Sequence, residues 1–188
     1  EWVLSLDADE RVTPALADEI RAVLASPDAA DGYWVRRELV YLGRLLRHGG
    51  ADTDWVLRLA RRDRARFSSD VIHEHLAVMG GGRERRLRGT LVHLKYRTLS
   101  EHLDNIDRYT TTIAARKGAQ GRRFASWHLL RVQWELFHRL VLRLGLLDGT
   151  PGVIWATMNA FYAFLKYAKL YPAAPGTDEG RVRDAGDR

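Results

Sequence analysis

Hydrophobic and polar residues follow two different rhythms along the chain. Up to about residue 97, apolar residues alternate with polar ones over short runs, as in β-strands half buried in a sheet. After that point they recur every three or four residues, as in amphipathic helices. We therefore expect an α/β sheet region over residues 1–97, an all-helical region over 98–172 and, because Gly, Pro and charged residues dominate there, a disordered tail over 173–188.

The same pattern places individual elements. The segments that fit strands are 1–6, 32–37, 54–60 and 89–96, whereas 39–46 fits a strand or a loop. The segments that fit helices are 14–25, 100–116, 122–144 and 153–169. Thr13 and Pro14 predict the N-cap and first turn of the first helix, and Ser100 is the expected N-cap of the second.

The last expected helix carries the longest apolar run. Residues 153–165 contain no charged side chain, and Lys166 and Lys169 follow. The run is shorter than the roughly 18 residues that a membrane-spanning helix requires. Such a helix lies in the membrane interface or is buried in a protein core, and the sequence alone favours neither.

Two acids follow the first expected strand. Asp7 and Asp9 are two residues apart, so on an extended backbone their side chains point to the same face. Neighbouring carboxylates repel each other unless a cation or a shared proton lies between them. Ligands of open α/β sheets bind just beyond the carboxyl ends of strands, so we expect a divalent metal at this position.

Two other interpretations of these acids stay open. The run from Asp7 to Glu10 can be a solvated turn with no ligand. A hydrophobic strand followed by Asp-x-Asp also begins haloacid-dehalogenase-like phosphatases, in which the first Asp is the nucleophile. Arg11 stands where those enzymes usually have Thr or Val, which weakens that match.

An arginine and three histidines add further candidates. Arg58 lies within an apolar strand, where its charge requires a carboxylate partner or a bound pyrophosphate. His73 and His75 share one face of an extended chain and can bind metal, while Glu74 between them can act as a general base. His93 lies on the face of a later strand that we expect to be the more polar one, within reach of a metal or phosphate. Ordinary packing or backbone hydrogen bonding is the alternative for each.

Composition narrows the classes of partner. The net charge of +6 and the isoelectric point near 9.9 are compatible with nucleic acid, an anionic membrane surface or a phosphorylated substrate. No helix-turn-helix, zinc-finger or aromatic RNA-binding pattern accompanies the basic residues, so we expect no nucleic-acid partner. The absence of Cys excludes disulfides and thiolate metal sites. The chain begins with Glu at the start of a strand, which suggests a fragment.

An ordered set of short sequence words makes the chain resemble family 2 glycosyltransferases, and more closely the bacterial lipopolysaccharide core β-1,4-glucosyltransferase group. The words are Trp2 to Val12, Tyr41 to Arg44, His48-Gly49-Gly50, Leu57-Arg58-Leu59, His73-Glu74, Leu99 to Leu103, Asn105 to Thr110, Leu144 to Gly149 and Phe164 to Lys169. They appear in the family's order and cover nearly everything before the tail.

The resemblance implies roles for specific residues. It implies a partial GT-A, Rossmann-like sheet that binds a nucleotide sugar, with Mg²⁺ or Mn²⁺ at the Asp-x-Asp bridging the diphosphate. Asp9 is the expected direct ligand, assisted by Asp7, and His73 or His93 would complete the metal shell. The roles of these two histidines are our own inference from the residues rather than part of the resemblance, and so is the contact that we expect between Arg58 and the diphosphate or a neighbouring acid. Glu74 would be the catalytic base that takes the acceptor hydroxyl's proton in an inverting displacement.

The resemblance also implies a reaction and a place in the cell. We expect hexose transfer from UDP-glucose to a lipopolysaccharide core or related cell-envelope glycolipid, by a protein bound peripherally at the cytoplasmic, inner face of the bacterial cell membrane. A non-catalytic membrane-associated or partner-binding module is the alternative of another class. The chain lacks the family's upstream portion, which grips base and ribose, so we expect weak or no activity from this chain alone.

Overall fold

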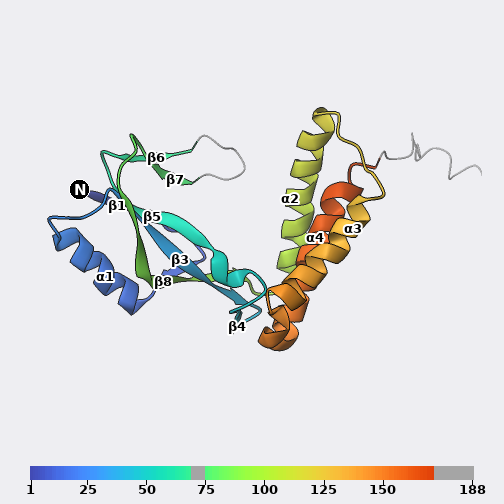
Figure 1. Ribbon diagram of the computed structural model, residues 1–188, viewed down its shortest axis with the longest axis horizontal. Coiled ribbons are helices and arrows are strands. Elements are labelled where there is room, and N and C mark those ends of the chain that lie inside the picture. Colours follow the sequence, from blue (N-terminus) through green and yellow to red (C-terminus); the bar gives the residue numbers. More distant parts are fainter. Residues whose placement is uncertain (69–74, 172–188) are drawn as a thin grey trace, which may run out of the picture.

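The computed structural model describes residues 1–68 and 75–171, which form a curved mixed sheet beside a group of helices (Figure 1). The strands are β1 (Trp2–Leu4), β2 (Glu10–Val12), β3 (Gly32–Tyr41), β4 (Arg44–Leu45), β5 (Trp55–Arg61), β6 (Ala65–Phe67), β7 (Leu76–Val78) and β8 (Glu84–Tyr96). The helices are α1 (Pro14–Ala25), α2 (Leu99–Ala119), α3 (His128–Phe137) and α4 (Gly149–Ala168), with the short helical turns η1 (Ala51–Thr53), η2 (His138–Leu142) and η3 (Gly145–Asp148). The expected α/β sheet followed by helices is confirmed, whereas the expected tail lies outside the described residues.

The main sheet has the strand order β1-β5-β3-β8-β2. β3 and β8 pair in parallel, and the other neighbouring strands on this path pair antiparallel. β4 returns along β3 through a tight turn in which Leu42 and Gly43 have φ of 49° and 75°. Two consecutive left-handed residues are typical of a type I′ hairpin turn. The segment 39–46, which fitted a strand or a loop, is therefore the end of a hairpin.

Helix α1 covers one face of the sheet (Figure 1). Thr13 accepts a hydrogen bond from the backbone N–H of Leu16, as predicted for the N-cap. Leu16 and Ile20 pack with Leu91 and other apolar residues of β3, β5 and β8 in the largest core cluster. The helix lies so close to β8 that a Cβ on Gly89 would stand 2.4 Å from the Cα of Leu16. This contact requires glycine at that position.

The helices α2, α3 and α4 pack together beside the far end of β3 and β8 (Figure 1). Trp155 of α4 joins Leu39, Tyr41 and Tyr96 of the sheet in a second core cluster. Asp148, just before α4, holds the loop that follows β4. Its carboxylate accepts hydrogen bonds from the backbone N–H groups of Arg47 and His48 at 3.0 and 2.8 Å. Two sequence words of the resemblance, His48-Gly49-Gly50 and Leu144 to Gly149, thus meet where sheet and helices join.

Two expected helix boundaries are wrong. Thr98, rather than Ser100, is the N-cap of α2, and it accepts a hydrogen bond from the N–H of Glu101 at 3.1 Å. Segment 122–144 is not one regular helix, because α3 passes into the π-helical turn η2 at His138. None of the helices within the two described ranges is long and apolar enough to cross a membrane.

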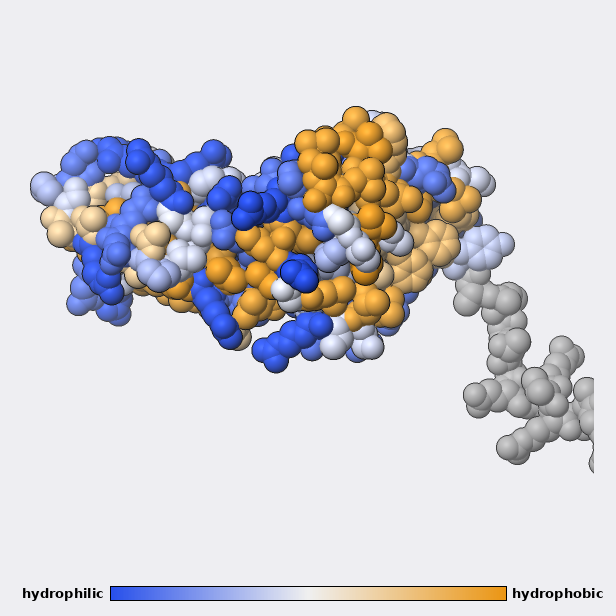
Figure 2. Space-filling model, turned by 90° about the horizontal axis from the view of Figure 1, so that it is seen from below, coloured by the Kyte–Doolittle hydropathy of each residue, from blue (hydrophilic) through white to orange (hydrophobic). Residues whose placement is uncertain are grey.

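The helical region buries α4 and exposes the apolar side of α3. Trp155, Ala156 and Ala160 of α4 are buried, so this helix forms part of the core. Six of the large apolar side chains exposed along α3, η2 and the residues beside them recur every three or four residues: Trp127, Leu130, Trp134, Phe137, Val141 and Leu144. We call these six residues the apolar stripe. An apolar area covers much of the helical half in the view from below (Figure 2).

Candidate active site

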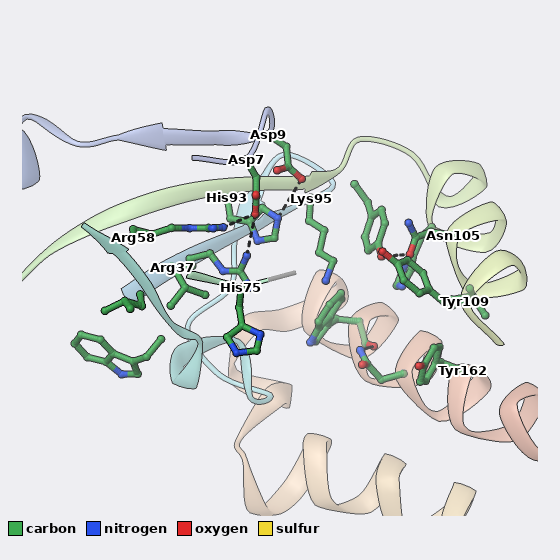
Figure 3. Close-up of a pocket in the computed structure, with 18 of the residues that line it drawn as sticks. Asp7, Asp9, Arg37, Arg58, His75, His93, Lys95, Asn105, Tyr109 and Tyr162 are labelled. Carbon is green, nitrogen blue, oxygen red and sulfur yellow. Dashed lines mark hydrogen bonds and ion pairs between the residues drawn. The ribbon is translucent and has the colours of Figure 1, made fainter. Parts of the chain in front are cut away.

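A cavity of about 870 Å³ lies between the sheet and the helices α2 and α4 (Figure 3). Its volume falls within the range of about 300–1,000 Å³ that is usual for small-molecule sites. Asp7, Asp9, Arg37 and Arg58 line it from the sheet side, and the opposite wall comes from the helices. The acids singled out in the sequence therefore lie at this cavity.

The two acids belong to a turn rather than to an extended strand. β1 ends at Leu4, and the N–H of Glu10 donates to the carbonyl oxygen of Asp7 at 3.0 Å. The carboxylate of Glu10 accepts a hydrogen bond from the N–H of Asp7 at 3.2 Å, which closes the turn from both ends. The run from Asp7 to Glu10 is thus a turn that lines the cavity, and the metal expected at its two acids stays a prediction.

Arg58 joins this turn to the middle of the sheet. Its Nη2 donates to Asp7 and, at 2.6 Å, to Glu10, whose side chain is fully buried. Burial alone would lower the pKa of Arg58, but hydrogen bonding and attraction from Glu10 and Asp7 raise it. The requirement for a carboxylate partner is thus met within the protein. Contact between Arg58 and a nucleotide stays a prediction.

Arg37 is a second, partly buried cation that the sequence did not single out. Its Nη1 lies 3.3 Å from Glu10 and 3.6 Å from Asp7, and its Nη2 lies 2.7 Å from Asp54. Asp7 therefore faces two guanidinium groups and keeps about half of its side chain exposed, at 52%. The site holds its acids in place with internal cations.

Asp9 is fastened separately, to β8. Its carbonyl oxygen accepts from the N–H of Leu94 at 2.8 Å, and its Oδ2 lies 3.1 Å from the Nε2 of His93. Burial, followed by the charge of Arg37, lowers the pKa of His93 although Asp9 opposes the shift. A neutral His93 can donate its Nε2 proton to Asp9 and orient that carboxylate, 43% of which is exposed.

The face of β8 that carries His93 is only partly polar: His93 and Lys95 line the cavity, as expected, but the earlier part of the same face is core. His93 is buried, at 6% exposure, on the face that Leu87 and Leu91 share, whereas Thr90 and Val92 are half-buried. Helix α1 covers the Leu87 and Leu91 part of that face, and the Asp7 to Glu10 turn covers its continuation. Metal ligation by His93 stays a prediction. Its Nε2 already contacts Asp9, so ligation through that atom would require this contact to break.

Lys95 extends into the space between the two walls (Figure 3). The surrounding protein atoms and then the charge of Arg37 lower its pKa, although the residue keeps contact with solvent. Asp7, Asp9, Arg37, Arg58 and Lys95 line the cavity, whereas Glu10 and Asp54 pair with the two arginines without lining it. The positive and negative charges of the ionic wall therefore nearly balance, and a divalent cation at Asp9 would add positive charge that favours a diphosphate.

The described residues contain no group of three or more acidic or histidine side chains placed to hold a metal. Mg²⁺ is commonly bound by one or two carboxylates together with substrate phosphates and water, rather than by a complete protein cage. The half-exposed carboxylate of Asp9, at 43% exposure, fits that limited role. The donor set therefore suits a divalent ion that arrives with a phosphorylated ligand.

The opposite wall is aromatic and uncharged. Tyr96 stacks on His102 with ring centroids 4.0 Å apart, and Trp155 lies 5.6 Å beyond. Burial raises the pKa of Tyr96 to about 12, and burial followed by the charge of Lys95 lowers that of His102 to about 4, so both are neutral near pH 7. Asn105 of α2 and Tyr162 of α4 belong to the same wall (Figure 3).

Two of the predicted residues, His73 and Glu74, lie outside the described residues, and their roles stay predictions. His75 lines the cavity, with its Nδ1 3.0 Å from the Oγ of Ser68. Sequence reasoning missed the buried acid Glu10 and the partner Arg37. The only available signal was that Glu10 directly follows the Asp-x-Asp run.

Comparisons with known proteins identify similar sequences. The chain is 31% identical over 185 residues to the lipopolysaccharide core biosynthesis glycosyltransferase LpsC of Rhizobium meliloti (strain 1021). The aligned region covers 95% of this chain and 68% of that relative. The chain is 24% identical over 180 residues to an uncharacterized glycosyltransferase of Rickettsia typhi, covering 90% of this chain and 62% of that relative. An uncharacterized glycosyltransferase of Rickettsia prowazekii matches with the same identity and coverage. No protein-family model and no solved structure matches the chain.

Proposed function

The chain belongs to the glycosyltransferases, and from that premise we propose that it is part of an inverting family 2 enzyme of GT-A fold. The enzyme transfers a hexose from a nucleotide sugar, UDP-glucose, to a lipopolysaccharide core or related cell-envelope glycolipid. The chain spans about two thirds of the length of its relatives, 68% and 62%, so the reaction is proposed for the protein of which this chain forms the matched part.

The observation that carries the proposal is the ionic wall of the cavity. Asp7 and Asp9 lie on one turn at its rim, with Lys95 extending between the walls (Figure 3). A leaving nucleoside diphosphate carries negative charge that grows as the bond to the sugar breaks, and preorganised cations stabilise that charge. The nearly balanced wall becomes attractive to a diphosphate once a divalent ion lies at Asp9.

Asp9 would hold that ion, with Asp7 beside it, and His93 would orient the Asp9 carboxylate through the 3.1 Å contact at its Nε2. When bound, Mg²⁺ or Mn²⁺ supplies Lewis-acid neutralisation of the diphosphate oxygens. Arg58 and Arg37 fix the position of Asp7 through their ion pairs. Lys95 contacts the diphosphate from the cavity side.

An inverting displacement needs a base for the acceptor hydroxyl. Glu74 is the proposed base, because it falls in the His-Glu word of the resemblance. Its carboxylate would accept the hydroxyl proton as the oxygen attacks the anomeric carbon, while the bond from that carbon to the diphosphate breaks. His75, the neighbouring residue on the described side, lines the cavity.

The apolar stripe supports peripheral attachment to an anionic bilayer at the inner face of the membrane. Its two tryptophans, Trp127 and Trp134, are 60% and 56% exposed, and Trp is enriched at membrane interfaces. Residues 122–147 contain five Arg and one acid, Glu135, which pairs with Arg139 at 2.7 Å. Apolar side chains among arginines fit a surface of anionic lipid. Such attachment would bring the cavity to a lipid-linked acceptor.

A transfer assay tests the proposed reaction. Radiolabelled UDP-glucose and delipidated lipopolysaccharide core would be incubated with this chain, with and without the portion of the Rhizobium relative that lies outside the matched region. We expect metal-dependent transfer in the longer protein, weak or no transfer in the chain alone, and at least a hundredfold loss in Asp9→Asn, on the order expected for removing a group that organises transition-state charge. Asp18→Asn, an exposed change on α1, is the matched control. Transfer that survives in Asp9→Asn at the parent rate would contradict the proposal.

Vesicle co-sedimentation tests the membrane proposal. Binding to vesicles of phosphatidylglycerol and phosphatidylethanolamine should fall when Leu130 and Trp134 are both changed to Asp. Leu24→Asp, at a side chain 47% exposed on α1, is the control and should leave binding unchanged. Equal vesicle binding by the parent, the double variant and Leu24→Asp would refute attachment through the stripe. So would a double variant that binds vesicles like the parent but no longer self-associates.

A further inference from the structure

The two walls of the cavity differ in chemistry. The sheet wall presents carboxylates and cations, among them Asp9 and Lys95, whereas the residues that α2 and α4 contribute to the lining are uncharged near pH 7. The labelled residues Asn105, Tyr109 and Tyr162 stand apart from the ionic group, on the helix side (Figure 3). A ligand of one chemical kind, such as a diphosphate, would use only one of these walls.

The helix wall offers neutral hydrogen-bonding groups at reachable positions. The hydroxyls of Tyr109 and Tyr162 have no hydrogen-bond partner among the described residues, and both side chains are half-buried. Asn105 accepts from the hydroxyl of Tyr96 at 3.0 Å through its Oδ1, which leaves its amide N–H₂ available. Asn159 donates to the carbonyl of Trp155 at 2.7 Å, which leaves its Oδ1 available. The wall therefore combines donors and acceptors without charge.

The aromatic rings of this wall are held in place from outside the cavity. The guanidinium of Arg108 lies 5.3 Å from the ring centroid of Tyr109, and the ammonium of Lys166 lies 5.6 Å from that of Tyr162. Neither cation lines the cavity. Cation–π contacts of this kind fix the orientation of the rings, so the wall is preorganised.

We propose that this wall, formed by Asn105, Tyr109, Asn159 and Tyr162, is the subsite for the saccharide of the acceptor. A sugar presents apolar C–H faces, which pack on aromatic rings, and neutral hydroxyls, which pair with amides and phenols. The proposal rests on the proposed transfer function, because it assigns the second substrate to the second wall. It also places the acceptor across from the diphosphate of the donor.

The size and polarity of the cavity favour a saccharide over the nucleotide base here. A volume of about 870 Å³ lies near the upper end for small-molecule sites, which leaves space for a sugar beside the diphosphate. His102 beneath the wall is neutral near pH 7, since burial lowers its pKa to about 4. Lys95, whose Nζ lies 5.6 Å from the ring centroid of Tyr96, extends between the walls and can reach phosphates on the sheet side. Binding of the base is the competing outcome of the test.

Saturation-transfer NMR and titration on this chain, without donor, test the subsite directly. The probes are delipidated lipopolysaccharide core oligosaccharide and uridine monophosphate. Tyr162→Phe removes one hydroxyl and should weaken oligosaccharide binding about fivefold, as expected for one neutral hydrogen bond. Tyr162→Ala should weaken it by about tenfold or more. The uridine monophosphate signal, which we expect to be weak without the portion that grips base and ribose, should be the same in the parent and in both variants. Phe161→Ala, at the neighbouring side chain of α4 with 38% exposure, is the matched control.

Several results would overturn the subsite. They are unchanged oligosaccharide affinity in both Tyr162→Ala and Tyr109→Ala, loss of uridine monophosphate binding in place of oligosaccharide binding, or no oligosaccharide binding by the parent chain. Equal thermal unfolding of parent and Tyr162→Phe shows that the comparison is made on folded protein. If oligosaccharide binding depends on Tyr162 while no hexose is transferred, the subsite is upheld and the transfer function is refuted.

Discussion

Acid is expected to weaken the junction between sheet and helices through His102. This side chain is 4% exposed, and its Nδ1 lies 2.9 Å from the hydroxyl of Tyr41. Burial raises the pKa of Tyr41 to about 12, so the phenol keeps its proton and donates it to a neutral imidazole. Protonation of His102 would remove this acceptor and place a charge between Tyr96 and Trp155.

The magnitude follows from the difference between the folded and unfolded pKa. Burial, and then the charge of Lys95, lowers the pKa of His102 from 6.5 to about 4. Above pH 6.5 both states are neutral, so the full stability is present. Below pH 6.5 the unfolded chain binds a proton that the folded chain does not, and stability is lost as the pH falls toward 4. Proton linkage then predicts a loss of about 2 kcal/mol between pH 7.5 and pH 5.

Urea unfolding followed by tryptophan fluorescence at these two pH values measures the loss. Other groups also titrate between these pH values, so the loss of unfolding free energy in the parent is compared with the loss in His102→Gln. The amide of this glutamine can accept from Tyr41 but does not titrate. The parent should lose about 2 kcal/mol more than this variant between pH 7.5 and pH 5. Leu103→Gln, at an exposed neighbouring position on α2, should keep the pH dependence of the parent. Equal losses in the parent and in His102→Gln would refute the reasoning.

Two further predictions concern the sheet. Arg58→Met should lower the free energy of unfolding by about 3–5 kcal/mol, because it leaves the fully buried carboxylate of Glu10 without its closest cation. The control Arg62→Met, at a side chain 73% exposed, should lower it by less than about 1 kcal/mol. Similar losses for the two variants in urea unfolding would contradict a stabilising role of the Arg58–Glu10 pair. Gly89→Ala should cost about 1–3 kcal/mol, because the added methyl would meet the Cα of Leu16 at 2.4 Å. Gly118→Ala on α2, where a Cβ meets nothing within 4 Å, should instead raise the melting temperature, and equal shifts for the two alanine variants would count against the packing of α1 on β8.

Local signals predicted local structure well. The N-cap Thr13, the following proline and the helical spacing of Leu16 and Ile20 lie within one short segment, and together they determine α1. The need of Arg58 for a carboxylate partner also follows from burying a charge in an apolar strand. The identity of that partner could be suggested by sequence only because Glu10 directly follows the two predicted acids.

Features that depend on contacts between distant segments could not be predicted. His93 was expected on a polar face because the alternating residues Val92 and Leu94 are apolar, but α1 and the turn from Asp7 to Glu10, both distant in the sequence, cover most of that face. The helix wall of the cavity unites residues of α2 and α4 with the end of β8, and no short motif relates them. The apolar run of α4 fitted a membrane interface or a core equally well, and only the burial of residues such as Trp155 shows that it is core.

The central claim is that the ionic wall binds a nucleoside diphosphate together with a divalent cation at Asp9. Calorimetric titration of UDP, with Mn²⁺ and then with a chelator, tests it most directly on this chain joined to the unmatched portion of the Rhizobium relative. We predict binding that requires Mn²⁺ and that is weakened at least tenfold in Asp9→Asn, as expected when a charged ligand group is lost. Binding of UDP that is equally tight with chelator and in Asp9→Asn, or no binding under any of these conditions, would contradict the account.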